Sequence, residues 1–222
     1  MLQELLLKTG WTAEQMLEHL LKKKIISSEV LQSIAEQPKQ DDFPQIKVGY
    51  YAFDGYLFSP YPDAYLKRQG VVVWVNPDKN APKGKRGLVM IPKLFAATIA
   101  SRFSDEKLDD FEDGSANTQK MLARKKYGVS FYGAELLSRY THNGIQAGQV
   151  FIPAIGQLAR IAKETNKINR ALLNIKAQPL KGVVLSSTEQ SVYNMFAYMF
   201  GSGQVTTVTK EVNVLIRGVF AV

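Results

Sequence analysis

The strongest constraint on the fold is a set of short apolar runs that glycine and proline interrupt. GVVVWV (70–75) and GLVMIP (87–92) have the length and composition of buried strands, because a buried helix needs ten or more residues. Further strand-like runs lie near the end of the chain, at 182–189, 194–200, 204–210 and 213–222. Asp54-Gly55 and Gly201-Ser202-Gly203 indicate hairpin turns. The pattern predicts strands at both ends of the main domain.

Between these strands the apolar spacing changes to that of helices. One helix is predicted over roughly 118–141, with a break at Gly128, and a second over roughly 154–174. The predicted fold class is therefore α+β, with an antiparallel sheet and two helices packed against it.

The first part of the chain reads as a small helical pair. Residues 11–36 carry an apolar stripe that is too small to form a core, so we expect 1–40 to be an attachment segment. It would mediate homo-oligomer formation or a larger assembly through 1–36, using Leu5, Leu6, Met16, Leu20, Ile25 and Leu31. The polar stretch QPKQDDFPQ contains the boundary, with a linker at 41–47 and the main domain at 48–222.

Several function classes are disfavoured by composition. The chain has no cysteine, which excludes disulfides and cysteine-ligated zinc. Its first residues, MLQELLLKTGW, do not form a signal peptide, and no apolar stretch reaches the ~18 residues of a membrane span. We therefore expect cytoplasmic synthesis, no membrane insertion and, as one route out of the cell, association with a virion.

The net charge of +8 is unevenly distributed. Residues 1–47 carry −1 and residues 48–222 carry +9, a surplus that attracts polyanions, although solubility alone also explains it. No motif with interleaved aromatic residues accompanies the charge, so nucleic acid is the least favoured partner. Two basic clusters could steer a polyanion. One is Lys83, Lys85 and Arg86, and the other is Arg124, Lys125 and Lys126.

Catalytic chemistry finds little support in the residues. His19 belongs to the helical pair, and His142 is a lone loop histidine, which is more often solvated than a general base. The acidic run DEKLDDFEDG has no EF-hand spacing, so a cation site there is the minor alternative to a solvated loop. We predict no catalytic residue, no metal and no cofactor.

The ordered motifs resemble a known family. VGYYAFDGY (48–56), GVVVWV, GLVMIP, Asn117-Thr118, VFIPAIGQL (150–158), INRAL (168–172), SSTE (186–189) and IRGVFAV (216–222) follow its order over roughly 175 residues. The family is named for the C-terminal domain of a Legionella collagen-like adhesin and is common in Bacteroidetes and their phages. Departures are Phe151 in place of tryptophan, Gln157 in place of glutamate and Gly218 in place of proline.

This resemblance implies a C-type-lectin-like fold, a twisted sheet that displays a binding surface. The implied function is a non-catalytic recognition or adhesion module that binds a glycan or a host-surface protein. A structural virion protein is the first alternative, and polyanion or nucleic-acid binding through the basic loops is the second. The Ser-Ser-Thr hydroxyls are expected to bond backbone groups, and Glu189 and Arg217 are predicted to form a structural ion pair.

The candidate ligand surface lies in the uncharged segment near the end of the chain. Short polar and aromatic side chains on a strand pair give contact area with little loss of entropy on binding. The predicted ligand-binding residues are Tyr193, Asn194, Met199, Thr207, Thr209, Asn213 and Leu215. Two other interpretations of this segment remain open, namely that it is an oligomer interface or that both of its faces are buried.

Overall fold

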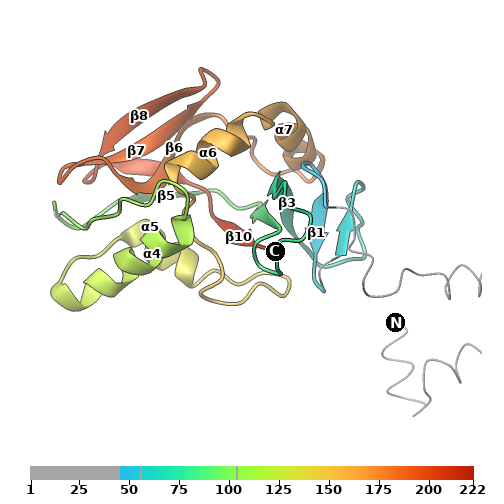
Figure 1. Ribbon diagram of the computed structural model, residues 1–222, viewed down its shortest axis with the longest axis horizontal. Helices are drawn as coiled ribbons and strands as arrows, with labels where there is room; N and C mark the ends of the chain where they lie inside the picture. Colours follow the sequence, from blue (N-terminus) through green and yellow to red (C-terminus); the bar gives the residue numbers. More distant parts are fainter. Residues whose placement is uncertain (1–45, 56, 104) are drawn as a thin grey trace, which may run out of the picture. The chain divides into compact units, whose positions relative to one another are not determined.

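Two five-stranded sheets form the framework of the described residues, which are 46–222 except 56 and 104 (Figure 1). Sheet A has the strand order β10-β4-β3-β1-β2, and all of its pairs are antiparallel. The bounds are β1 Tyr51–Phe53, β2 Leu57–Ser59, β3 Arg68–Val75, β4 Gly87–Met90 and β10 Val219–Ala221. The predicted attachment segment at 1–40, with His19, lies outside the described residues.

Sheet B carries the strands near the end of the chain. Its order is β5-β9-β6-β7-β8, and β6 pairs with β9 in parallel. The predicted hairpin is confirmed, because residues 201–203 connect the paired strands β7 and β8. The bounds are β5 Phe95–Thr98, β6 Gly182–Glu189, β7 Asn194–Phe200, β8 Gln204–Thr209 and β9 Asn213–Ile216.

The last strand-like run crosses from one sheet to the other. It is divided into β9, which pairs with β5 in sheet B, and β10, which pairs with β4 in sheet A. Pairing with the earlier part of the domain is thus confirmed, but a single strand over 214–222 is wrong. At the crossing the carbonyl of Gly218 accepts a hydrogen bond from the amide of Ile91 at 3.1 Å, so the two sheets are joined where their strands change over.

Among the described residues, four α-helices replace the two that were predicted for the main domain. The first predicted helix is α4 (Gly114–Ala123), a 3-10 turn η1 (Arg124–Tyr127) and α5 (Tyr132–Ser138), interrupted where Gly128 takes a φ of 75°. The second is α6 (Ile155–Ala162) and α7 (Thr165–Asn174). Between these two the hydroxyl of Thr165 donates to the carbonyl of Ala162 at 2.7 Å, which satisfies an acceptor at the end of α6.

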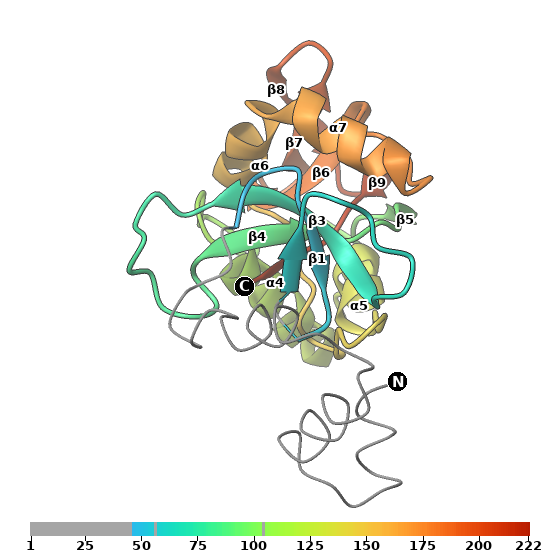
Figure 2. The ribbon, with the colours of Figure 1, turned by 90° about the vertical axis from the view of Figure 1, so that its right-hand side faces the viewer.

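The helices cover opposite faces of the sheets. In Figures 1 and 2, α6 and α7 lie on the upper side and α4 and α5 on the lower side. Adjacent residues of one strand alternate between two apolar clusters, so that Val72 belongs to the lower cluster while Val71 and Val73 belong to the upper one. The middle of β3 and all of β4 are buried on both faces, which explains why their sequences are continuous apolar runs.

Gly114 allows the start of α4 to approach the start of α6. A Cβ at this position would lie 2.6 Å from the amide nitrogen of Ala154, a backbone atom that no side-chain movement can displace. Gly114→Ala is therefore expected to lower the free energy of unfolding by about 2 kcal/mol or more. Urea titration monitored by circular dichroism would measure this loss. The neighbouring Ser115→Ala serves as the control, and equal stability of the two variants would contradict the steric explanation.

Candidate functional site

A groove of about 1150 Å³ in the described part of the chain is a candidate site. Its floor is apolar and includes Phe53, Leu88 and Phe220, each at most 6% exposed. Its rim is polar and comes from the β1–β2 turn, the β3–β4 loop, the loop 141–149, α6 and the segment before α4. An apolar floor with a polar rim is the usual composition of a ligand site.

A stacked cluster of three side chains lies on the rim. The guanidinium of Arg160 lies 5.3 Å from the ring centroid of Trp74 and forms an ion pair with Glu112. Because the arginine is held by a carboxylate on one element and an aromatic ring on another, its orientation is fixed before any ligand arrives.

The groove has both hydrogen-bond donors and acceptors. Gln146 and Gln149 are exposed on the loop 141–149, and this loop is anchored because Gln69 donates to the carbonyl of Asn143 at 3.0 Å. Gln157 is different. Its side-chain oxygen accepts from the amides of Gly114 and Ala154, at 3.1 and 2.9 Å, so this amide is structural.

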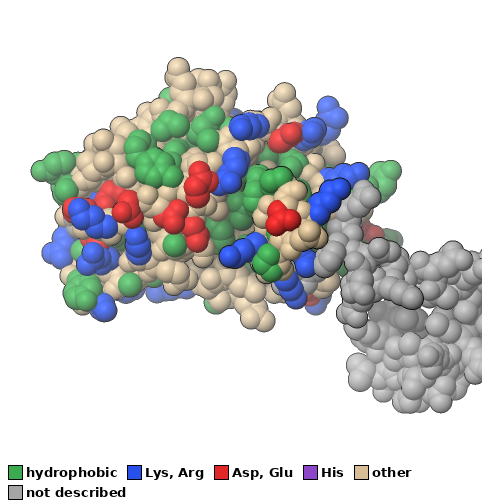
Figure 3. All heavy atoms as spheres, in the orientation of Figure 1, with side chains coloured by type: hydrophobic (Ala, Val, Ile, Leu, Met, Phe, Trp, Pro, Cys, Tyr) green, Lys and Arg blue, Asp and Glu red, His purple; other side chains and the backbone are tan. Residues whose placement is uncertain are grey.

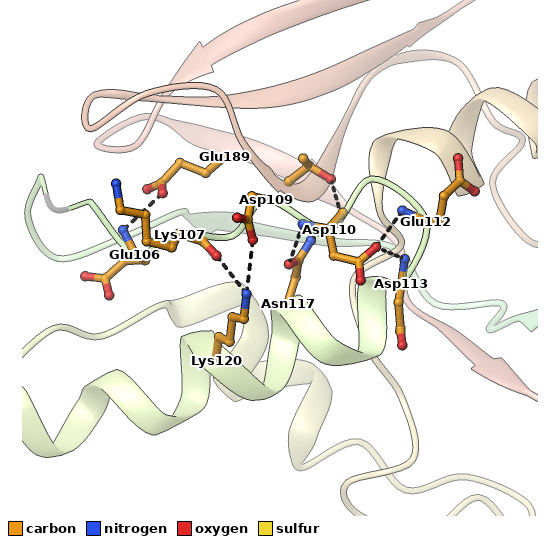
Figure 4. Close-up of polar contacts among 10 residues, drawn as sticks. Glu106, Lys107, Asp109, Asp110, Glu112, Asp113, Asn117, Lys120 and Glu189 are labelled. Atoms are coloured by element: carbon orange, nitrogen blue, oxygen red, sulfur yellow. Dashed lines mark hydrogen bonds and ion pairs between the residues drawn. The ribbon is translucent and has the colours of Figure 1, made fainter.

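The acidic run before α4 is a hydrogen-bonded loop (Figure 4). Asp110 accepts from the amides of Glu112 and Asp113, at 2.8 and 2.7 Å, and Asp113 caps α4 through the amide of Ser115 at 2.9 Å. Lys120 donates to Asp109 at 3.1 Å. Side chains and amides of the chain itself thus occupy these carboxylates, and no metal-binding group of three or more His, Cys, Asp or Glu residues occurs among the described residues.

Two of the three hydroxyls of the SSTE run bond backbone groups as expected, whereas the buried hydroxyl of Ser187 has no hydrogen-bond partner among the described residues. Ser186 donates to the carbonyl of Phe196 at 2.7 Å. Thr188 donates to the carbonyl of Asp110 at 3.2 Å and accepts from the amide of Ile155 at 3.1 Å. The acidic loop, the start of α6 and the middle of sheet B are therefore held together by this strand.

The predicted ion pair between Glu189 and Arg217 is wrong. Glu189 pairs with Lys210, whose side chain is fully buried, and also accepts from the amide of Glu106 at 3.0 Å. Arg217 instead donates to the carbonyls of Gln178 at 2.7 Å and Pro92 at 3.3 Å. The reason is that β9 and β10 diverge at Arg217, which directs its side chain to the crossing between the sheets rather than to the end of β6.

The buried guanidinium of Arg217 remains charged at neutral pH. Burial lowers the pKa of Arg217 to about 10, because the charged form loses hydration in the interior. The two carbonyl acceptors partly replace that hydration and join the segments that contain Pro92 and Gln178. Arg217 is therefore a structural residue, as predicted, although with different partners.

The predicted ligand-binding residues do not form one surface. Cross-strand pairs place Asn194 opposite Thr209, and Phe196 opposite Thr207, on one face of sheet B. Met199 has the other parity and lies on the opposite face. Asn213 and Leu215 lie on β9, separated from β8 by two strands. Tyr193 is 59% exposed in the turn before β7, where its ring contacts that of Phe103 edge to face at 5.1 Å between centroids.

The two strands of the hairpin differ in their burial. Residues 195 and 197 of β7 are fully buried, and residues 198 and 200 are less than 10% exposed, so β7 is covered on both faces. Strand β8 carries the exposed positions, including Val205 and Thr207. The alternative that both faces are buried is therefore correct for β7 and wrong for β8.

The basic clusters lie on two distant elements. Lys83, Lys85 and Arg86 belong to the β3–β4 loop, whereas Arg124–Lys126 belong to η1 after α4, at the left end of Figure 1. Arg124 pairs with Glu106, and Lys125 pairs with Glu135 at 2.7 Å. Figure 3 shows acidic and basic side chains side by side on the face that it presents. Steering of a polyanion by these residues stays a prediction.

His142 is exposed, and its ring lies beside the side-chain amide of Asn143, with 2.9 Å between the two nitrogens. Within the described residues, no helix is both long and apolar enough to span a membrane.

Sequence reasoning missed the groove. Its rim residues come from many separate segments, and several of them are single amides, such as Gln69 and Gln146, that carry no local pattern. Local sequence patterns predict strands, helices and turns, but they do not identify such isolated residues as members of one site. Only the folded chain brings these residues together.

Comparison with known proteins gives a likeness in fold. No protein-family model matches the sequence, and no curated protein matches it. A solved fimbrial protein from Bacteroides ovatus superposes with a TM-score of 0.60 at 15% sequence identity. The superposition covers 80% of this chain and 49% of the fimbrial protein, so the chain spans about half of that protein's length. The α+β class is confirmed, with two sheets and four α-helices in the described residues, and the C-type-lectin-like fold stays a prediction.

Proposed function

We propose that the chain is a non-catalytic recognition module of a surface appendage or a phage particle, and that it binds a neutral oligosaccharide in the groove. The observation that carries the proposal is the groove itself. Its volume of about 1150 Å³ lies slightly above the roughly 300–1,000 Å³ of small-molecule sites and is sufficient for several sugar rings. The fold likeness to a fimbrial protein supports a role at a surface.

The charges of the groove favour a neutral ligand over a sulfated one. Three carboxylates (Asp54, Glu112 and Asp113) and two cations (Lys85 and Arg160) line it. The groove is thus slightly acidic although the whole chain has a net charge of +8, and it would repel sulfate groups rather than attract them. Hydroxyl groups suit this lining because they both donate to carboxylates and accept from amides.

The carboxylates of the groove are engaged in ways that suit binding. Glu112 is paired with Arg160, Asp113 caps α4, and Asp54 accepts from the amide of Gly55 at 3.0 Å. Glycoside hydrolysis needs one carboxylic acid that gives up its proton and a second carboxylate opposite it. Carboxylates already held in these contacts support recognition without turnover.

Ligand affinity of the groove is expected to change little with salt concentration and to fall when rim residues are substituted. A screen of neutral and sulfated glycans at two salt concentrations should find neutral ligands whose affinity changes little with salt. Calorimetric titration with the best neutral glycan should then show about tenfold weaker binding for Gln146→Ala and for Asp54→Ala, because each removes a rim hydrogen bond. The melting temperatures of both variants should stay within a few degrees of that of the unmodified chain.

Tyr193→Ala and Thr207→Ala are the matched controls, because they alter the surface that the sequence predicted. If these variants weaken glycan binding and the groove variants do not, the hairpin is the site and the groove proposal fails. Binding to sulfated glycans alone, lost at high salt, would support the polyanion alternative instead.

A further inference from the structure

Strand β8 differs from the other sheet edges of the described residues. The edge strands of sheet A, β2 and β10, have three residues each, and Phe151 bridges to Val219 at the outer side of β10. The other edge of sheet B, β5, has four residues. Strand β8 has six, and in Figures 1 and 2 no other segment of the described residues lies beyond it.

This edge carries none of the features that usually prevent strands from pairing with other molecules. Natural edges are protected by charged side chains, proline or bulges. Residues 190–209 contain no charged residue and no proline, and the β7–β8 register has no shift, whereas β1–β3, β3–β4 and β6–β7 each have one. Val205 is 51% exposed. An open, uncharged edge of this kind is expected to be covered when the protein works.

The register fixes which backbone groups of β8 point outward. The amide of Lys210 donates to the carbonyl of Tyr193 at 2.9 Å, so this pair belongs to the hydrogen-bonded set of the ladder. Hydrogen-bonded pairs alternate along an antiparallel ladder, so residues 204, 206 and 208 also face β7. The backbone groups of Val205, Thr207 and Thr209 therefore point away from the sheet, except that the Thr209 carbonyl also accepts from the amide of Val212 at 3.2 Å.

We propose that β8 pairs antiparallel with β8 of a second copy of this chain, with Thr207 opposite Thr207. A two-fold axis perpendicular to the sheet leaves the same face of both copies on the same side. Residues that pair across the axis must therefore both have odd numbers or both have even numbers. Centring on Thr207 meets this condition and places Val205 opposite Thr209 of the other copy. The outward amides then meet outward carbonyls, and a ten-stranded sheet continues across the interface.

A second copy suits this edge better than a charged partner strand. From residue 205 to residue 209, every side chain that would meet across the axis is threonine or valine, so self-pairing brings no like charges together there and forms favourable Thr–Thr contacts. This interface is separate from the predicted assembly through residues 1–36 and does not depend on the groove.

The absence of cysteine makes a direct test possible. In the proposed register, Thr207→Cys brings two thiols into a directly opposed pair, with Cα atoms about 5.5 Å apart, a distance that a disulfide spans. Mild oxidation of the full chain should therefore cross-link Thr207→Cys into a dimer. Val205→Cys is the matched control, because it is more exposed than most of the strand yet lies opposite Thr209 rather than itself. Equal cross-linking of the two variants, or none in either, would overturn the register.

Charge substitution tests the interface without covalent chemistry. Thr207→Lys and Thr207→Glu each place like charges opposite one another, so sedimentation analysis should show self-association at least about tenfold weaker for each variant alone. An equimolar mixture should restore it, because lysine then faces glutamate. Gln119→Lys, an exposed change on α4, should leave association unchanged. Undiminished association of the Thr207 variants would refute the proposal.

Discussion

A chain that ends after Lys210 is expected not to fold. The deletion removes β9 and β10, so each sheet loses a strand and β5 loses the strand with which it pairs. It also removes the buried side chains Val214, Ile216, Val219, Phe220 and Val222. Burial of five such side chains contributes roughly 7–15 kcal/mol at about 1.5–3 kcal/mol each, which is comparable with the whole stability of a typical domain.

Circular dichroism and thermal melting of the shortened chain would measure this loss. The expected result is an insoluble or non-cooperatively melting product. Glu211→Ala with Val212→Ala changes exposed residues of the same segment and should melt like the full chain. A soluble shortened chain with a sharp melting transition would show that the two sheets hold together without the crossing strands.

Lys210→Met is expected to lower the free energy of unfolding by about 3–5 kcal/mol. Lys210 is fully buried and its partner Glu189 is only 7% exposed, so the substitution leaves a carboxylate in the interior without its cation. The effect should extend to neighbouring segments. Glu189 also accepts from the amide of Glu106, and the carbonyl of Lys210 accepts from the amide of Ala100 at 2.9 Å. Chemical denaturation would measure the change.

A second substitution separates the loss of the ion pair from the loss of packing. Glu189→Gln in the Lys210→Met background removes the unpaired charge and keeps an acceptor for Glu106, so much of the lost stability should return. Lys107→Met is the matched control. It breaks an exposed pair with Asp105 at 2.6 Å, and the melting temperature should hardly move. If the double variant is no more stable than Lys210→Met alone, the buried charge is not the cause.

The β7–β8 hairpin shows what the alternation of residues in a sequence can predict and what it cannot. Strand β7 and strand β8 have similar uncharged sequences, and both were correctly predicted as strands joined at Gly201–Gly203. Only the strand order makes β7 an inner strand and β8 an edge, and this difference decides which residues are accessible. The predicted ligand set mixed both kinds of position because alternation along a strand does not reveal its neighbours.

The partners of the charged residues could not be predicted from the sequence either. The basic and acidic clusters are visible in the sequence, but their partners are set by elements distant along the chain, as with Glu189 and Lys210 or Arg160 and Glu112. Arg217 was correctly judged structural, yet its neighbours depend on the point at which the last strand changes sheets.

Most strands, the hairpin turns and the α+β class could be predicted from the sequence, because they follow from local conformational preference and apolar spacing. Strand β5 was missed. The tertiary structure alone decided that there are two sheets, that the last strand crosses between them, and that a polar-rimmed groove and an open edge at β8 exist. Each of these depends on which distant segments bury one another's surface, and that choice is made by the packing of the whole domain rather than by any one stretch of residues.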